Sequence, residues 1–367
     1  MTVNFSELAV PGVRRLQPYQ PGKPIEDLER ELGLRDIVKL ASNENPLGPG
    51  QSALEAMRSC AGSLHRYPDG NGFALKAALA ERLGVAPGQI TLGNGSNELL
   101  ELLARAFMTP ADEVVFSQHA FAVYPLVTQA VGARAVVTPA RDWGHDLEAM
   151  QAAVGPKTRL VFIANPNNPT GTWLAAEALR SFVSALPAHV LVVLDEAYFE
   201  YVEEPAYPDT MAWLAECPNL VITRTFSKIH GLAGLRVGYG VSHPDVADLL
   251  NRVRQPFNVN SVALAAARAA LADIEHVERS VNINRRGMQQ LVAACGELGL
   301  EYIPSVGNFL SIDMACPGAE AYRALLHEGV IVRPLANYEM PQHLRVTIGL
   351  EAENARFIAA LRKVLGR

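Results

Sequence analysis

A lysine in the middle of the chain, Lys228, has neighbours that suit an amine working beside a phosphate group. It follows the hydroxyl residues Thr225 and Ser227 at the end of an apolar run, and a glycine-rich stretch that contains Arg236 comes soon after it. Hydroxyl groups and a guanidinium are well suited to holding phosphate. A lone lysine is usually a solvated surface residue, so this segment becomes specific only in combination with others.

Three further polar segments follow apolar runs. The segment 93–97 (Gly-Asn-Gly-Ser-Asn) opens a helix-like stretch, and free N–H groups at a helix start can bind phosphate. It lacks the third glycine of a dinucleotide fingerprint, because Glu98 stands there, and Ser96 could simply cap the helix. Residues 165–171 (Asn-Pro-Asn-Asn-Pro-Thr-Gly) could be only a turn. Asp195 could be a helix cap, but an aspartate after a buried run more often has a cationic partner.

The elements that position these segments follow an α/β pattern. Between about residues 90 and 242, short β-branched runs alternate with helix-like stretches, which predicts a mostly parallel sheet between two layers of helices. Ligands bind at the carboxyl ends of such strands, where the polar segments fall, so we expect the segments to converge on one pocket.

The rest of the chain predicts a second, smaller domain and an arm. Longer helical stretches over 264–273 and 275–298 precede strand candidates near 309–312 and 343–348. The first 30 residues contain four prolines and cannot form one continuous helix. We therefore predict three parts, which are an N-terminal arm (1–30), a large cofactor-binding domain (31–255) and a small α/β domain (256–367).

The composition narrows the class of protein. The 367 residues carry 32 basic and 38 acidic side chains, a net charge of −6 with no block of like charges, which argues against nucleic acid or a membrane surface as a partner. We see no apolar stretch of a signal sequence or a membrane span and expect a cytoplasmic protein. The four cysteines are too scattered for a metal site or a disulfide scaffold, so we expect no metal and reduced thiols.

In chain order, these segments resemble those of the fold-type I pyridoxal-phosphate-dependent aminotransferases, and within them the histidinol-phosphate aminotransferase family. The resemblance covers nearly the whole chain and rests on PYQPGKP, LASNENPLGP, RYPDG, GNGSNE, NPNNPTG, LDEAY, TFSKIHGLAGLRVGY and LRVTIG. It implies pyridoxal 5'-phosphate as the cofactor. It also implies transamination of L-histidinol phosphate with 2-oxoglutarate, which gives imidazole acetol phosphate and L-glutamate in histidine biosynthesis.

The resemblance implies a role for each matching cofactor residue. Lys228 would carry the cofactor as a Schiff base and shuttle a proton, and Asp195 would keep the ring nitrogen protonated. Asn168 and Tyr198 would bond the phenolic oxygen, and Phe121, where many relatives have a tyrosine, would stack on the ring. The residues that would hold the cofactor phosphate are Ser96, Asn97, Thr225, Ser227 and Arg236.

Five further residues are predicted around the substrate and the subunit boundary. Tyr67 matches a tyrosine that reaches the cofactor phosphate of the neighbouring subunit, which implies a homodimer with shared active sites. Arg345 matches the arginine that receives the α-carboxylate of the substrate. Arg333 could add a second cation for a phosphate ester or form a structural ion pair, and Tyr19 in the arm would close over the substrate. Asn43 completes the predicted substrate-binding set.

Other functions share parts of this pattern. An aromatic amino acid aminotransferase and a phosphothreonine decarboxylase-like lyase would have the same cofactor segments, so these segments do not separate the three activities. A nucleotide-binding or regulatory module that uses the glycine loop alone would not need Lys228, Asp195 and Asn168 together.

Overall fold

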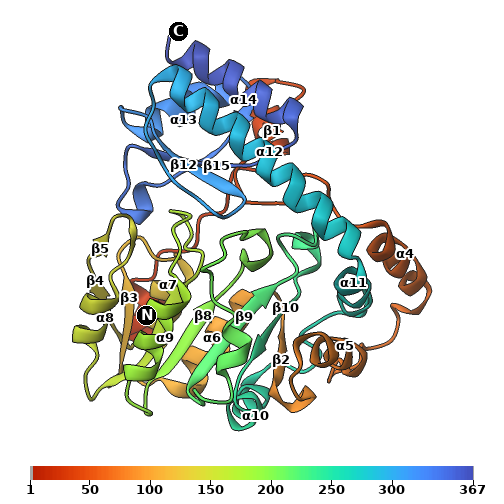
Figure 1. Ribbon diagram of the computed structural model, residues 1–367, viewed down its shortest axis with the longest axis vertical. Helices are drawn as coiled ribbons and strands as arrows, with labels where there is room; N and C mark the ends of the chain where they lie inside the picture. Colours follow the sequence, from red (N-terminus) through yellow and green to blue (C-terminus); the bar gives the residue numbers. More distant parts are fainter. Residues whose placement is uncertain (1–2, 367) are drawn as a thin grey trace.

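The computed structural model describes residues 3–366 as two stacked α/β bodies (Figure 1). The larger body surrounds the central sheet, the smaller one contains most of the C-terminal part, and helix α12 (Ile274–Leu298) runs between them. Met1 and Thr2 of the predicted arm and Arg367 of the predicted small domain lie outside the described residues.

The central sheet of the described chain has seven strands and confirms the predicted α/β fold. Its order is β2-β10-β9-β8-β7-β3-β4. Strand β10 is antiparallel to both of its neighbours, while the pairs from β9 to β4 are parallel. The strands are β2 (Ile90–Gly93), β3 (Glu113–Ser117), β4 (Arg134–Thr138), β7 (Thr158–Ala164), β8 (Leu191–Asp195), β9 (Leu220–Thr225) and β10 (Gly238–Val241).

Helices cover both faces of this sheet, which explains why its inner strands are continuous apolar runs rather than alternating ones. The apolar sides of α6, α7 and α10 form one core with one face of the sheet, and α8 and α9 form another core with the opposite face. A third core joins α4, α5 and α11 to β2 and β10. The bounds are α4 (Gln51–Cys60), α5 (Phe73–Leu83), α6 (Ser96–Phe107), α7 (Val123–Ala130), α8 (Leu147–Ala153), α9 (Ala176–Ala185), α10 (Pro244–Val253) and α11 (Ser261–Ala272).

The smaller body is built on an antiparallel sheet with the strand order β11-β12-β15-β14. Its core is formed with α12, α13 and α14. The strand candidates near 309–312 and 343–348 are confirmed as β12 and β15, and the two predicted helical stretches as α11 and α12. The bounds are β11 (Tyr302–Ile303), β12 (Phe309–Asp313), α13 (Gly318–His327), β14 (Arg333–Pro334), β15 (His343–Thr347) and α14 (Glu351–Val364).

Two contacts cross the predicted domain limits, which stay predictions. Strand β1 (Val38–Lys39), inside the predicted large domain, pairs in parallel with β13 (Val330–Ile331) of the smaller body. Helix α11, inside the predicted small domain, packs against α4 of the larger body. The chain therefore passes from the smaller body to the larger one just after β1, close to the segment that contains Asn43.

The N-terminal arm is a series of short helices with an extended stretch between them. Helices α1 (Phe5–Leu8) and α2 (Pro11–Arg14) precede the extended stretch that contains Tyr19, and α3 (Ile25–Leu32) follows it. Helix α2 packs on α7 of the larger body. The prolines thus interrupt the helix as expected, and they place Tyr19 on a stretch of chain between two anchored segments.

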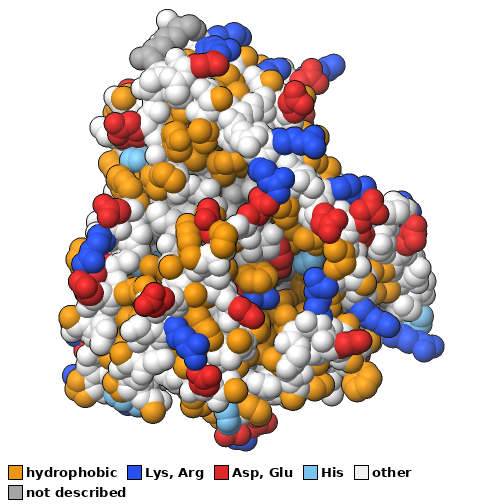
Figure 2. Space-filling view, viewed as in Figure 1, with side chains coloured by type: hydrophobic (Ala, Val, Ile, Leu, Met, Phe, Trp, Pro, Cys, Tyr) orange, Lys and Arg blue, Asp and Glu red, His pale blue; other side chains and the backbone are white. Residues whose placement is uncertain are grey.

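The described surface has mixed charge and no candidate membrane span. On the face drawn in Figure 2, acidic and basic side chains are interspersed rather than gathered by sign. Among the helices of residues 3–366, none has the length and apolar composition that crossing a bilayer requires.

Candidate active site

A cavity lies at the carboxyl ends of β7, β8 and β9, where the sheet meets the smaller body. Residues at all three strand ends line it, together with residues of the arm, of the segment after β1 and of β14 and β15. The structure places every predicted site residue except Tyr67 on the wall of this cavity. These residues are Tyr19, Asn43, Ser96, Asn97, Phe121, Asn168, Asp195, Tyr198, Thr225, Ser227, Lys228, Arg236, Arg333 and Arg345.

One end of the cavity is a cup formed by the glycine loop and the start of α6. Gly95 has a positive φ of 76°, a backbone conformation that favours glycine, and a Cβ atom there would lie 2.3 Å from Nη2 of Arg236 and would displace this guanidinium. The loop leads into Ser96 at the first position of α6, and Gly95 before it provides no side-chain cap. The N–H groups at the start of this helix are therefore available to an anion.

Hydroxyl groups and a guanidinium complete the cup. Arg236 donates from Nη1 to Oγ of Ser227 at 3.2 Å, and the backbone N–H of Ser227 donates to Oγ1 of Thr225 at 3.1 Å. Within residues 3–366, no carboxylate forms an ion pair with Arg236. An unneutralised guanidinium beside hydroxyl groups and a helix start is a suitable site for a phosphate group.

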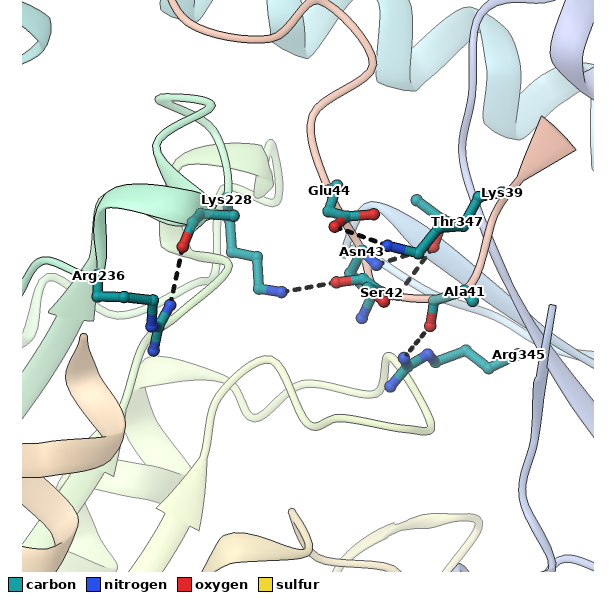
Figure 3. Close-up of polar contacts among 10 residues, drawn as sticks. Lys39, Ala41, Ser42, Asn43, Glu44, Lys228, Arg236, Arg345 and Thr347 are labelled. Carbon is teal, nitrogen blue, oxygen red and sulfur yellow. Dashed lines mark hydrogen bonds and ion pairs between the residues drawn. The ribbon is translucent and has the colours of Figure 1, made fainter. Parts of the chain in front are cut away.

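Lys228 reaches across the cavity to the segment after β1 (Figure 3). Its Nζ donates to the backbone carbonyl of Ser42 at 3.0 Å. Burial of the amine, helped by the nearby charges of Arg345 and Arg236 and opposed by Glu44 and Asp195, lowers the pKa of Lys228 from its ordinary value of 10.5 to about 7. A large fraction of this amine is therefore neutral near pH 7, so it can act as a nucleophile and as a base.

Asp195, at the end of β8, is only 5% exposed and has hydrogen-bond donors on both carboxylate oxygens. The hydroxyl of Tyr124 donates to Oδ2 at 3.1 Å, and that of Thr223 donates to Oδ1 at 3.3 Å. Burial nevertheless raises the pKa of Asp195 to about 6. A cation beside this carboxylate would lower that pKa again, so the site suits a positively charged ring nitrogen.

Asn168 and Tyr198 present polar groups to the middle of the cavity. Oδ1 of Asn168 accepts from Nη1 of Arg345, which leaves the Nδ2 amide as a donor. The hydroxyl of Tyr198 accepts from Nδ2 of Asn43 at 2.9 Å, and burial raises the pKa of Tyr198, which keeps its proton available for donation. Half-buried Phe121 adds an aromatic ring to the wall.

Two arginines face each other across the ladder of the small sheet. Arg333 on β14 and Arg345 on β15 are directly paired, and they are 8% and 5% exposed. Among the described residues, neither has a carboxylate within ion-pair distance. Arg345 donates to the backbone carbonyl of Ala41 at 2.8 Å (Figure 3). Arg333 lies 5.6 Å from the ring centre of Tyr19. Like charges paired in this way repel each other, so an anion between them would be stabilised.

Tyr67 lies away from the cavity of its own chain. Its side chain is 82% exposed and stacks on Phe257, with ring centres 4.7 Å apart. In residues 3–366, no group of three or more His, Cys, Asp and Glu side chains is arranged to hold a metal ion, and the four cysteines are free.

Sequence reasoning missed the backbone groups and the supporting side chains of the site. The carbonyls of Ala41 and Ser42 bind Arg345 and Lys228, although the segment LASNENPLGP was recognised. The sequence suggested no role for Tyr124 and Thr223, which bind Asp195. Thr223 is the first residue of the segment 223–228 that ends at the lysine, so its position was a usable signal.

Comparisons with known proteins agree with this geometry. The model of the family "aminotransferase class I and II" matches residues 35–361. The chain is 61% identical over 361 residues to histidinol-phosphate aminotransferase 1 of Nitrosococcus oceani, with 98% of each chain covered. It is 63% identical over 369 residues to histidinol-phosphate aminotransferase 2 of Pseudomonas fluorescens strain Pf0-1, with 100% of each covered. The crystal structure of histidinol-phosphate aminotransferase from Sinorhizobium meliloti in complex with pyridoxal-5'-phosphate matches with a TM-score of 0.90 at 33% identity, over 98% of this chain and 97% of that one.

Proposed function

Because the chain belongs to the histidinol-phosphate aminotransferases of the class I and II aminotransferase family, we propose that it transfers the amino group of L-histidinol phosphate to 2-oxoglutarate. The products are imidazole acetol phosphate and L-glutamate, the pathway is histidine biosynthesis, and the cofactor is pyridoxal 5'-phosphate. The observation that carries the choice of substrate is the buried pair Arg333 and Arg345, which has no carboxylate partner among the described residues.

The residues of the cavity fit pyridoxal phosphate. The cup at Gly95 and Arg236 has the free N–H groups that a phosphate ester needs, and a guanidinium without a carboxylate partner among the described residues. Asp195 offers a buried carboxylate to a ring nitrogen, and Lys228 offers an amine with a pKa of about 7. When bound, pyridoxal phosphate supplies a carbonyl group that takes up the amino group and a ring that accepts electrons.

Lys228 has two tasks in this reaction. Its neutral Nζ would be the nucleophile that attaches the cofactor to the protein. With the substrate amine in its place, the same Nζ would take the proton from the substrate carbon that bears the amino group and would return a proton on the cofactor side. The carbonyl of Ser42, 3.0 Å from Nζ, is the group that holds the free amine inside the cavity.

Three residues orient the ring and tune its electrons. Asp195 would hold the proton on the ring nitrogen, because a carboxylate partner raises the pKa of that nitrogen. Asn168, whose Oδ1 is occupied by Arg345, would donate from Nδ2 to the phenolic oxygen, and Tyr198, which accepts from Asn43, would donate its hydroxyl proton to the same oxygen. Phe121 would offer an aromatic surface to the face of the ring.

The arginine pair accounts for two kinds of substrate anion. Histidinol phosphate presents a phosphate ester where glutamate presents its α-carboxylate, so both groups must bind at one place. Arg345 can form a bidentate contact with either group, and Arg333 adds the second positive charge that a dianionic phosphate favours. Tyr19 is 47% exposed and lies beside the guanidinium of Arg333, in a position to close over the substrate.

Two alternatives make different demands on the site. An aromatic amino acid aminotransferase binds the α-carboxylate of each amino acid at this place, which Arg345 can hold without a second arginine. A phosphothreonine decarboxylase-like lyase also binds a phosphate, but it would leave the cofactor in its aldehyde form after each turnover. A transaminase converts the cofactor to the amine form and needs an oxo acid to restore it.

Half-reactions of the purified holoenzyme test the proposal. The enzyme is mixed with histidinol phosphate, phenylalanine or glutamate in separate experiments, and conversion of the cofactor to the amine form is followed by absorbance. We expect histidinol phosphate to react with the highest kcat/KM, and 2-oxoglutarate to restore the original spectrum. A preference for phenylalanine would favour the aromatic aminotransferase, and release of carbon dioxide from phosphothreonine would favour the lyase.

The oligomeric state and the cellular location of the protein are part of the same proposal. We propose a cytoplasmic homodimer in which exposed Tyr67, supported by the ring of Phe257, reaches the cofactor phosphate of the partner subunit. Hybrid dimers of a Lys228→Ala chain with a Tyr67→Phe chain test this arrangement. In such a hybrid, one site contains both an intact lysine and an intact tyrosine, so we expect about half of the wild-type activity. If Tyr67 acted within its own chain, both sites would carry a defect and the hybrid would be no more active than its parents.

A further inference from the structure

Tyr124 is a fully buried tyrosine beside the active site that the proposed reaction does not use. It lies in the first turn of α7 and is 0% exposed. Its ring stacks on Phe162 of β7, with centres 4.7 Å apart and planes 8° from parallel. It also meets the ring of Phe121 edge to face, at 5.8 Å and 86°. These contacts hold the tyrosine ring in a fixed orientation between the sheet and the cavity wall.

The hydroxyl of Tyr124 points at a carboxylate rather than at solvent or the backbone. It donates to Oδ2 of Asp195 at 3.1 Å, while Thr223, the direct neighbour of Asp195 in the β8–β9 ladder, donates to Oδ1 at 3.3 Å. Burying a phenol hydroxyl costs free energy that a phenylalanine would avoid, and a phenylalanine would fill the same space. Packing therefore explains the ring but leaves the hydroxyl unexplained.

We propose that Tyr124 is a positioning residue that keeps Asp195 ionised and aimed at the ring nitrogen of the cofactor, while its edge-to-face contact sets the plane of Phe121. The inference rests on the cofactor role proposed for Asp195. A carboxylate with a donor on each oxygen is favoured in its ionised form, because a protonated carboxyl would set its own hydrogen against one of these donors. One side chain thus links the two groups that would contact the ring at its nitrogen and on its face.

Several other groups affect the pKa of Asp195, so the effect of Tyr124 must be distinguished from theirs. Burial has the largest effect and raises the pKa of Asp195, and the charge of Glu196 acts in the same direction, whereas the hydrogen bonds from Tyr124 and Thr223 lower this pKa. The other titratable groups that interact with Asp195 are Tyr198, Tyr207 and Lys228. A substitution that removes only one hydroxyl therefore tests its contribution against an unchanged background.

The test compares the holoenzymes of Tyr124→Phe and Thr223→Val with the wild type. Each variant loses one donor to Asp195 and keeps nearly the same shape. With Asp195 less firmly ionised, the cofactor ring carries less positive charge, so the nitrogen attached to Lys228 is protonated more easily. We expect the midpoint of the pH titration of the cofactor absorbance to move upward in both variants. We also expect the half-reaction with histidinol phosphate to slow about tenfold in Tyr124→Phe, the effect of one hydrogen bond to a charged group, with little change in KM.

Two further variants separate this role from packing. Thr128→Val removes another buried hydroxyl of α7, which donates to the backbone carbonyl of Tyr124 at 2.7 Å and does not touch Asp195, so the titration midpoint should stay at the wild-type value. Tyr124→Leu removes the ring as well and should weaken cofactor binding more than Tyr124→Phe does, because Phe121 loses its edge contact.

The outcomes are distinct. A wild-type midpoint and rate in Tyr124→Phe, or an equal shift in Thr128→Val, would overturn the proposal and leave Tyr124 as a packing residue. The titration needs no substrate, so it gives an answer even if the enzyme prefers another amino donor. Failure of the wild-type protein to bind pyridoxal phosphate would instead refute the proposed function itself.

Discussion

In the proposed function, the choice of substrate depends most on Arg333, and the substitution Arg333→Ala tests this role directly. The arginine lies on β14, opposite Arg345 on β15, and both line the cavity. A structural ion pair was the alternative explanation for Arg333 in the sequence. In the described part of the chain, no carboxylate is placed to form that pair. The guanidinium is therefore free to bind an anion from outside the protein.

The expected magnitude follows from one charge-assisted hydrogen bond. With Arg333 only 8% exposed, its contact with a phosphate would be little weakened by solvent. Such a bond contributes about 1.5–3 kcal/mol, so its loss should lower kcat/KM for histidinol phosphate about ten- to a hundredfold. Phenylalanine presents one carboxylate, which Arg345 can hold alone, so its kcat/KM should fall much less.

The assay measures kcat/KM for histidinol phosphate and phenylalanine with the same enzyme preparations. Arg345→Ala should damage both substrates, because both anions use that arginine. Arg333→Lys keeps the charge without the planar fork and should fall between the wild type and Arg333→Ala. Arg323→Ala removes an exposed arginine of α13 from the same body and serves as the matched control, with no expected effect. Equal small losses for both substrates in Arg333→Ala would rule out phosphate recognition by Arg333 and favour an aromatic aminotransferase.

Three further predictions concern the cofactor site and the stability of the fold. Lys228→Ala should abolish the absorbance of the attached cofactor and nearly all turnover. In the wild-type apoenzyme, the rate of cofactor attachment should rise with pH through about 7 and then level off. The reason is that the amine is protonated below its lowered pKa and neutral above it. Asp195→Asn should still bind the cofactor but lose most of the rate in the half-reaction, since an amide does not stabilise a protonated ring nitrogen, and wild-type activity would contradict this role. Glu196→Gln should lower the free energy of unfolding, measured in urea, by about 3–5 kcal/mol, because buried Arg224 loses the carboxylate that lies 2.8 Å from it. Glu203→Gln, which removes the carboxylate of an exposed pair with Arg285, is the control and should have little effect.

The strand pattern and the side-chain chemistry of the site were readable from the sequence because both depend on residue type. Continuous apolar runs predicted buried parallel strands, and Asp195 and Thr225 stand at the ends of two of them. Since parallel strands end at the same edge of a sheet, residues far apart in the chain could be predicted to meet. The structure brings them to one cavity.

Contacts that depend on register or on backbone atoms were not readable in the same way. Arg333 lies on a strand of two residues, too short for any periodicity, so its pairing with Arg345 emerges only from the ladder between β14 and β15. The carbonyl of Ser42 carries no signal of residue type, because every residue has one. It reaches Lys228 because β1 is anchored to β13 of the smaller body and the chain then crosses to the larger one.

The positive charges of the cavity connect substrate binding to the basicity of Lys228. Arg345 and Arg236 both lower the pKa of the lysine, which keeps Nζ neutral for its first task as a nucleophile. An anion bound at either arginine offsets part of that charge, so the pKa of the free lysine should rise once the cofactor phosphate and the substrate phosphate are in place. A base of higher pKa takes a proton from carbon more readily. The arginines that bind the two anions would therefore also influence how basic Lys228 is when it takes the proton from the substrate.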